Sequence, residues 1–235
     1  MLRKQALITG ATGDIGKVIA ADLSKAGYNL LLCGNKGEFD TSQIVTDYSE
    51  FRFDISSAEQ VRATFKDISK QFGKIDLLVS CAGVAAPEQM LIDMSDDVID
   101  KLILTNLNGT IYTNKYALPL LNKGGSIVNI SSFLGETGCC CEAAYAAAKA
   151  GVINLTKSLA QEFAPFLVRV NSISPGYIDT KMNSEFSPEE KQQIIQQTPL
   201  KRLGKPEDIS SAVLFLAQNT FITGENITIS GGYTI

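Results

Sequence analysis

Short, continuously apolar segments recur along the chain, and helix-like segments separate most of them. The apolar segments are typical of strands because they are short and several end at Gly or Asn. The longer segments carry apolar residues at helical spacing, as at Ile15, Val18, Ile19 and Leu23. The pattern predicts strands at residues 5–9, 28–33, 51–53, 75–80, 126–130, 169–173 and 226–229, and helices at 15–26, 57–72, 96–122, 143–163, 188–197 and 207–217.

The order of these elements predicts an α/β fold. Strands that alternate with helices and are apolar throughout form a parallel sheet with helices on both faces, which is the Rossmann-type, doubly wound arrangement. No repeat or linker-like stretch divides the 235 residues, so a single domain is expected. Residues 183–205 lie between Thr180 and a proline-containing segment, and we expect them to form a mobile substrate lid.

Charge and residue types exclude several classes of function. A net charge of −4 offers no basic surface to a phosphate backbone, so nucleic-acid binding is not expected. No apolar run has the length of a secretory or membrane-spanning segment, so a cytoplasmic protein without membrane contact is expected. The chain has no histidine, which removes the imidazole base of serine hydrolases and papain-like enzymes.

The five cysteines are expected to be free thiols. Cys33 and Cys81 lie in strand-like runs, and Cys139, Cys140 and Cys141 are consecutive, without a Cys-x-x-Cys pair. Three adjacent ligands converge poorly on one tetrahedral ion, and no histidine is available to complete a typical zinc site. No metal site is therefore expected.

A glycine-rich turn lies between the first predicted strand and the first predicted helix. Glycines let the backbone turn sharply and bring amide groups at the helix start close to an anion, which suits the pyrophosphate of a dinucleotide. A tight turn without a ligand is the alternative interpretation. The turn comprises Thr9, Gly10, Ala11, Thr12, Gly13, Asp14, Ile15 and Gly16.

The end of the second strand predicts which dinucleotide binds. An acid at this place would bond a free ribose 2′-hydroxyl, but the residues here are Gly34, Asn35 and Lys36. Without a carboxylate and with a cation nearby, the site favours NADP(H), and NAD(H) is the alternative. Asp54, followed by Ile55, could accept a hydrogen bond from the adenine amino group, whereas a helix N-cap is its alternative role.

Tyr145 and Lys149 lie four residues apart in the predicted helix 143–163, so their side chains share one face. An ammonium nearby lowers the pKa of a phenol from its usual value of about 10. Tyrosine then serves as the acid or base that histidine supplies elsewhere. A surface pair is the alternative, but Ser131 and Ser132 end the strand 126–130, at the edge where doubly wound folds bind ligands.

Together these motifs resemble the short-chain dehydrogenase/reductase family over essentially the whole chain. The glycine turn is similar to the family's TGxxxGxG, and Ser80-Cys81-Ala82-Gly83 is similar to its NNAG segment. Pro175-Gly176-Tyr177-Ile178-Asp179-Thr180 resembles the PG motif that holds the nicotinamide amide. The family's catalytic tetrad falls on Asn106, Ser132, Tyr145 and Lys149.

The resemblance implies a role for each of these residues. Tyr145 would donate a proton to the substrate oxygen, Ser132 would bond that oxygen, and Lys149 would hold the nicotinamide ribose and lower the pKa of Tyr145. Asn106 would support a water relay behind Lys149, or alternatively only bond a neighbouring strand. The remaining implied cofactor contacts are Cys81, Ala82, Gly83, Pro175, Gly176, Ile178 and Thr180.

Two departures from the family pattern stand out. Asp14 replaces the middle glycine of the turn and puts a carboxylate where the backbone usually approaches phosphate, which places cofactor affinity in question. Ser80 and Cys81 replace the two asparagines of NNAG, so the bonds that tie adjacent strands must be made differently or lost.

Segments 143–158, 175–182, 202–204 and 222–225 resemble bacterial 3-oxoacyl-[acyl-carrier-protein] reductases within the family. The resemblance implies NADP(H)-dependent reduction of a ketone, with a 3-oxoacyl thioester of fatty acid biosynthesis as the first substrate, and a homotetramer. One alternative is an alcohol, sugar or steroid dehydrogenase of the same family. The other is a non-catalytic dinucleotide sensor, which Asp14 and the altered NNAG segment suggest.

Overall fold

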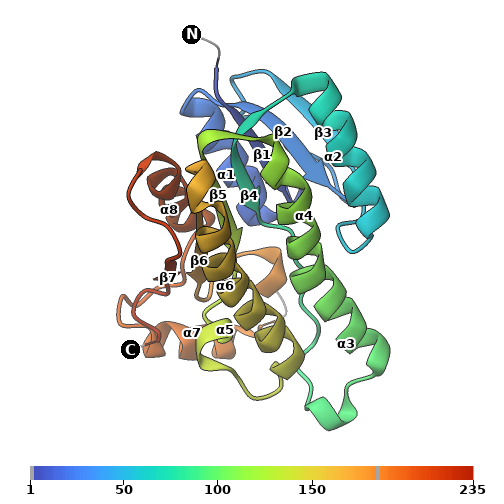
Figure 1. Ribbon diagram of the computed structural model, residues 1–235. Helices are drawn as coiled ribbons and strands as arrows, with labels where there is room; N and C mark the ends of the chain where they lie inside the picture. Colours follow the sequence, from blue (N-terminus) through green and yellow to red (C-terminus); the bar gives the residue numbers. More distant parts are fainter. Residues whose placement is uncertain (1–2, 184–185, 235) are drawn as a thin grey trace.

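Seven parallel strands form one sheet in the order β3-β2-β1-β4-β5-β6-β7 in the computed structural model (Figure 1), which describes residues 3–183 and 186–234. The strands are β1 (Gln5–Thr9), β2 (Asn29–Gly34), β3 (Tyr48–Arg52), β4 (Ile75–Ser80), β5 (Leu121–Ile130), β6 (Arg169–Pro175) and β7 (Asn226–Ile229). The helices are α1 (Asp14–Lys25), α2 (Ala58–Phe72), α3 (Asp96–Ile103), α4 (Gly109–Ala117), α5 (Leu134–Thr137), α6 (Ala143–Phe163), α7 (Pro188–Gln197) and α8 (Pro206–Gln218). The predicted doubly wound α/β fold is confirmed.

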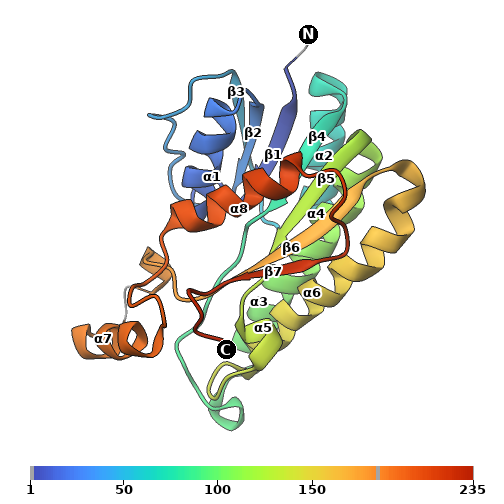
Figure 2. The ribbon, with the colours of Figure 1, turned by 90° about the vertical axis from the view of Figure 1, so that its left-hand side faces the viewer.

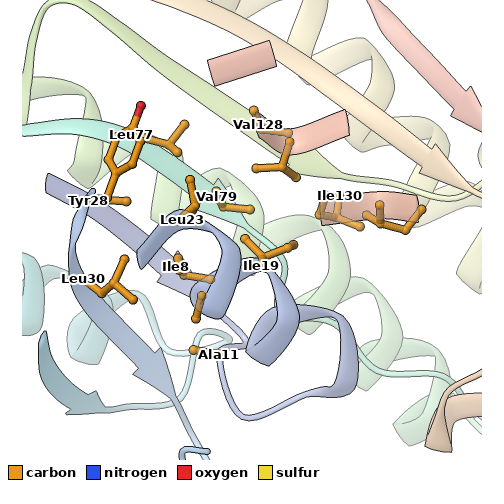
Figure 3. Close-up of a cluster of buried hydrophobic side chains, with 14 of the residues drawn as sticks. Ile8, Ala11, Ile19, Leu23, Tyr28, Leu30, Leu77, Val79, Val128 and Ile130 are labelled. Atoms are coloured by element: carbon orange, nitrogen blue, oxygen red, sulfur yellow. The ribbon is translucent and has the colours of Figure 1, made fainter. Parts of the chain in front are cut away.

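Apolar layers cover both faces of the sheet. Figure 2 shows α1 and α8 lying across one face of the sheet. The buried side chains of Ile8 and Val79 belong to the apolar cluster on this face. Figure 3 shows these side chains meeting Ile19 and Leu23 of α1. The neighbouring strand position Leu7 packs on the opposite face with residues of α2, α4 and α6. Because both faces are covered, the inner strands β1, β2 and β4 are apolar at successive positions, which is the pattern that predicted the fold.

The segment predicted as one helix over 96–122 is divided in the structure. A π-helical turn, Leu104–Asn108, separates α3 from α4, which ends at Ala117. Pro119 lies in the following 3₁₀ turn, and β5 begins at Leu121. The predicted end at residue 122 is wrong because proline lacks the N–H that a helix interior needs. Gly124 and Gly125, which follow the predicted end of this helix, lie where β5 shifts its register against β4.

The other predicted elements agree with the structure to within a few residues at their ends. The third strand is β3, which begins three residues before the predicted 51–53, and the short α5 was not predicted. Within the expected lid, α7 begins with a capping box in which Ser187 and Glu190 bond each other's backbone N–H. Residues 184 and 185 of the lid lie outside the described residues, and its motion stays a prediction.

The carboxyl ends of the strands meet at the end of the molecule opposite the N-terminus, near α3, α5 and α7 (Figure 1). In doubly wound folds this is the edge that binds ligands. Motif residues follow directly after the strands there, so the fold brings segments far apart in the sequence to one place. The strands concerned end at Thr9, Gly34, Ser80, Ile130 and Pro175.

Candidate active site

The structure brings Ser132, Tyr145 and Lys149 together. Tyr145 lies in the first turn of α6, Lys149 follows one turn later, and Ser132 follows the end of β5. The Lys149 ammonium is 5.7 Å from the centre of the Tyr145 ring. The Ser132 hydroxyl is close enough to the Tyr145 phenol to lower the pKa of that phenol. The alternative of an exposed Tyr–Lys pair is therefore wrong, because Lys149 is only 5% exposed.

Lys149 is a cation held below the surface. Its ammonium donates to the carbonyl of Ile130, the last residue of β5, at 3.1 Å. The Ser131 hydroxyl donates to the Lys149 carbonyl at 2.8 Å, which fixes this turn of α6 against the end of β5. Burial lowers the pKa of Lys149 to about 8, because the charged form loses its hydration.

The pKa of Tyr145 is shifted in the direction opposite to the one expected. Burial raises the pKa of this phenol to about 12, the Ser132 hydroxyl only partly opposes this, and the nearby Glu142 carboxylate raises the pKa further. The expected lowering by Lys149 is wrong for this structure, in which the ammonium bonds the Ile130 carbonyl. The phenol is thus protonated at neutral pH, which is the state required of a proton donor.

Asn106 is buried in the π-helical turn between α3 and α4. Its side chain accepts from the Val84 N–H at 3.0 Å and donates to the Val84 carbonyl at 2.9 Å, so both polar ends bond the segment after β4. Gly83 lies between two of the tetrad residues: an added Cβ would be 2.7 Å from the Asn106 amide oxygen and 3.4 Å from the Lys149 ammonium. Asn106 therefore makes the structural hydrogen bonds that were its alternative role. Its part in a water relay stays a prediction.

The glycine turn is packed tightly against the segment after β4. Gly10 has a φ of +69°, and a Cβ there would lie 2.7 Å from the Ala82 backbone. A Cβ at Gly16 would collide with the Gly10 carbonyl oxygen. The Thr9 hydroxyl accepts the N–H groups of Cys81 and Ala82 at 3.2 and 3.3 Å. Only glycine fits these two turn positions, which leaves a backbone cradle at the N-terminus of α1 that fits a phosphate group.

Asp14, the first residue of α1, has both carboxylate oxygens bonded within the protein. One accepts from the Lys17 ammonium at 2.8 Å, and the other accepts from the backbone N–H of Lys181 at 2.7 Å. Partial burial would raise the pKa of Asp14, but these bonds outweigh it and the pKa is lowered. The carboxylate thus joins the glycine turn to the segment that directly precedes the expected lid, a role that its sequence position did not reveal.

The residues expected near the adenosine lie close to the end of β2. The Asp54 carboxylate accepts from the backbone N–H and hydroxyl of Ser56 at 2.9 and 2.7 Å. These bonds to Ser56, with smaller contributions from Asn35 and Lys36, lower the pKa of Asp54. The N-cap interpretation of Asp54 is wrong, because α2 is capped by Ser57, which accepts from the Gln60 N–H.

Arg52 is a cation that the sequence reasoning missed at this place. The register of β2 and β3 pairs it with Gly34, and its guanidinium donates to the Gly37 carbonyl at 2.8 Å. The guanidinium also lies over the Phe39 ring, 4.7 Å from its centre. No sequence signal indicates this position, because the register of a parallel pair depends on residues distant in the chain.

The segment after β6 completes this edge of the sheet. The Pro175 carbonyl accepts from the Phe133 N–H at 3.0 Å, which ties the segment to the residue after Ser132. Gly176 donates to the Ile229 carbonyl at 2.9 Å. Ile178 is buried and pairs with Gly204, and its carbonyl accepts from the Thr180 hydroxyl at 3.4 Å.

The side-chain hydrogen bonds that the family's NNAG segment makes between adjacent strands are made here by other residues. Asn114 of α4 donates to the Ser80 hydroxyl at 3.3 Å and to the Asn129 amide oxygen at 2.9 Å. Asn129 in turn donates to the Thr156 hydroxyl at 3.1 Å. This buried chain connects β4, α4, β5 and α6. The departure at Ser80 and Cys81 is therefore compensated, and Asn114 and Asn129 were not found by sequence reasoning because buried amides carry no motif of their own.

The five cysteines are free thiols. Across residues 3–183 and 186–234, no helix has the length and apolar character needed to cross a membrane. The same residues contain no cluster of three or more histidine, cysteine or acidic side chains that could hold a metal ion.

Comparison with known proteins gives consistent matches. A family model described as enoyl-(acyl carrier protein) reductase matches residues 10–234. The 3-oxoacyl-[acyl-carrier-protein] reductase FabG of Staphylococcus aureus is 37% identical, with 98% of each chain covered. Carbonyl reductase family member 4 of Xenopus laevis is 34% identical, also with 98% of each chain covered.

Solved structures give the same result for the fold. A short-chain dehydrogenase/reductase from Brucella melitensis, described as SDR:glucose/ribitol dehydrogenase, has a TM-score of 0.90 and 35% identity over 99% of this chain and 97% of the other. A short-chain dehydrogenase/reductase from Serratia marcescens has a TM-score of 0.92 and 26% identity, with 99% and 98% covered.

Proposed function

The chain belongs to the short-chain dehydrogenase/reductase family of oxidoreductases, and on that basis we propose that it reduces a ketone with NADP(H), a 3-oxoacyl thioester being its first substrate. The observation that carries the proposal is the buried Lys149 ammonium beside Tyr145, with the Ser132 hydroxyl acting on the same phenol. The relative from Staphylococcus aureus, which is named for acyl-carrier substrates, supports the choice of thioester.

In the proposed mechanism each group of this site has a distinct task. Ser132 bonds the substrate oxygen, and Tyr145 donates its proton to that oxygen as the carbonyl is reduced. Lys149 holds the ribose next to the nicotinamide and supplies a positive charge beside the oxygen that gains negative charge. When bound, the nicotinamide supplies the hydride that adds to the carbonyl carbon.

The backbone cradle described above supports the proposed cofactor contacts. The glycine turn and the start of α1 would hold the pyrophosphate, with Thr12, Gly13 and Ile15 in the turn itself. Ala82 and Gly83 would line the cofactor site, and Ile55 and Asp54 would bind the adenine. Pro175, Gly176, Ile178 and Thr180 would hold the nicotinamide amide. A tetramer remains part of the proposal as a family expectation.

Lys36 and Arg52 favour NADPH over NADH in this proposal. Both are exposed cations at the carboxyl ends of β2 and β3, where a 2′-phosphate would lie. Replacing both with glutamine is expected to weaken NADPH binding about 30-fold, since each charge-assisted bond contributes about 1 kcal/mol, and to leave NADH binding almost unchanged. Titration of each cofactor by fluorescence measures this.

Lys70→Gln, a change of an exposed cation on α2, is the matched control and should alter neither affinity. Equal losses for NADPH and NADH in the double variant would contradict a 2′-phosphate site.

Two changes at Asp14 separate its charge from its bond to the Lys181 N–H. Asp14→Asn keeps an oxygen acceptor but removes a negative charge beside the pyrophosphate, so cofactor binding should tighten about threefold to tenfold. Asp14→Gly also removes the bond, so residues 181–205 should become more susceptible to limited proteolysis. Asp67→Asn, which removes an exposed acid paired with Lys70, is the control. Weaker cofactor binding by Asp14→Asn would show that the carboxylate has another role.

NADPH oxidation with a thioester panel tests the function. Acetoacetyl thioester should be reduced, whereas an enoyl thioester, the substrate type suggested by the family description, should not. Turnover of alcohols, sugars or steroids with NAD or NADP would favour the alternative dehydrogenase. Cofactor binding without turnover of any compound would favour a dinucleotide sensor and overturn the enzymatic proposal.

A further inference from the structure

Three consecutive cysteines lie between Ser132 and Tyr145, in the loop that connects α5 to α6. Cys139 and Cys140 are exposed, and Cys141 is half-buried. The sulfur atoms of Cys140 and Cys141 are 3.6 Å apart, so two thiols face each other within contact distance at the surface. None of the tasks assigned above to the active-site residues uses this pair.

The loop is connected to its surroundings through the backbone of the same cysteines. The Cys141 carbonyl accepts from the Gln89 N–H at 3.0 Å, which joins it to the segment that follows β4. The Cys139 carbonyl accepts from the Glu142 N–H at 3.4 Å, just before α6 begins. Cys141 has a φ of +65°. A change in the Cys141 backbone would therefore shift the first turn of α6, which carries Tyr145.

We propose that Cys140 and Cys141 form a dithiol site that small-molecule disulfides oxidise to a vicinal disulfide. The exposed Cys140 thiolate attacks the disulfide RSSR, forming a mixed disulfide and releasing RS⁻, which takes up a proton. The Cys141 thiolate then attacks the Cys140 sulfur, forms the Cys140–Cys141 bond and releases the second RS⁻, which is protonated. Two protein thiols are oxidised and one RSSR is reduced to two RSH.

The bond formed in this way should be easily reversed. Adjacent residues have Cα atoms about 3.8 Å apart, whereas protein disulfides usually span about 4.4 to 6.8 Å. The ring is therefore strained, and a strained disulfide has a higher reduction potential and returns readily to the dithiol. The site is suited to a reversible modification and not to a structural cross-link.

The charges around the loop determine which small-molecule disulfides react fastest with the cysteines. The carboxylates of Glu88 and Glu142 interact electrostatically with the Cys139 thiol, and Glu88 also interacts with the Cys141 thiol. The Tyr177 phenol interacts with Cys139 and Glu88. Partial burial and these carboxylates raise the pKa of the Cys139 thiol, and the Cys140 contact raises the pKa of the Cys141 thiol. A cationic disulfide should therefore react faster than an anionic one, and the rate should rise as the pH increases above neutral.

Oxidation should lower the activity, a consequence that rests on the proposed function. Closing the ring alters the Cys141 backbone and with it the start of α6. Displacing a proton donor by a fraction of an ångström is expected to reduce kcat/KM about tenfold. The thiol chemistry itself does not depend on what the protein catalyses.

The test treats the reduced full-length chain with cystamine, which is cationic, and with oxidised glutathione, which is anionic. Mass spectrometry of the peptide with residues 139–141 should show the loss of two hydrogen atoms, and cystamine should react about tenfold faster at low salt. Cys141→Ser should stop at a mixed disulfide on Cys140, and Cys139→Ser should still close the ring. Dithiothreitol should restore both mass and activity.

Each other outcome is informative. A mixed disulfide alone in the wild type, or a ring that requires Cys139, overturns the assigned pair. Faster reaction with oxidised glutathione overturns the role of the carboxylates, and full activity of the oxidised protein overturns the coupling to α6. If neither redox form reduces any carbonyl, the proposed function fails, whereas the mass measurement still decides the dithiol site.

Discussion

Tyr145→Phe is expected to reduce kcat for ketone reduction about 1000-fold, the middle to upper range for loss of a general acid. The substitution removes only the hydroxyl, so the ring keeps its place beside the Lys149 ammonium. The raised pKa of the phenol, about 12, means that it carries its proton at neutral pH and can donate it. Cofactor affinity and the melting temperature should change little, because loss of a single hydroxyl contact costs at most about 1 kcal/mol.

Tyr48→Phe is the matched control. Its hydroxyl is exposed on β3 and makes one long bond, of 3.4 Å, to Thr41, so the variant should keep wild-type kcat. Steady-state kinetics with a carbonyl substrate and single-turnover measurements separate chemistry from binding. Equal kcat values for Tyr145→Phe and the wild type would remove the phenol from the mechanism.

Most of the fold could be predicted from the sequence because the hydrophobic pattern follows the burial of each strand. Leu7 and Ile8 of β1 face opposite layers and both are fully buried, so the strand is recognisable without knowing its neighbours. The end of the helix predicted over 96–122 was not found because its apolar spacing continues past Ala117 into β5. The π-helical turn at Asn106 was also not found, since no residue preference marks it.

The candidate site could be predicted in its composition but not in its electrostatics. Spacing and strand ends brought Ser132, Tyr145 and Lys149 together, yet the pKa of the phenol depends on burial that no local pattern reveals. The bond from the Lys181 N–H to the Asp14 carboxylate joins residues 167 positions apart. Contacts of this kind follow from the tertiary arrangement, and so does the place of Arg52 beside Gly34.

Lys149→Met is expected to abolish most activity and also to stabilise the protein at neutral pH. Burial lowers the pKa of Lys149 from 10.5 to about 8, so the folded state holds the charged lysine at an energetic cost. At about 1.4 kcal/mol for each pKa unit, that cost is about 3 kcal/mol at neutral pH. Loss of the bond to the Ile130 carbonyl offsets about 1 kcal/mol, which leaves a gain of about 2 kcal/mol, or about 5 °C in melting temperature.

The pH dependence distinguishes this explanation from better packing of methionine. Between about pH 8 and 10.5 the unfolded chain binds the Lys149 proton and the folded protein does not, so the wild type regains stability as the pH rises through this range. The advantage of Lys149→Met should therefore shrink between neutral pH and about pH 10. Improved packing would give the same advantage at both pH values.

Lys157→Met is the control for Lys149→Met, because Lys157 is exposed on the same helix α6 and the change should affect neither activity nor melting temperature. In Lys149→Met, kcat/KM should fall about 100-fold or more, since the cation beside the reacting oxygen is lost. A variant that is less stable than the wild type at neutral pH would show that the buried charge is compensated within the fold. The expected result is that this fold accepts a destabilising charge at the position where the proposed chemistry requires it.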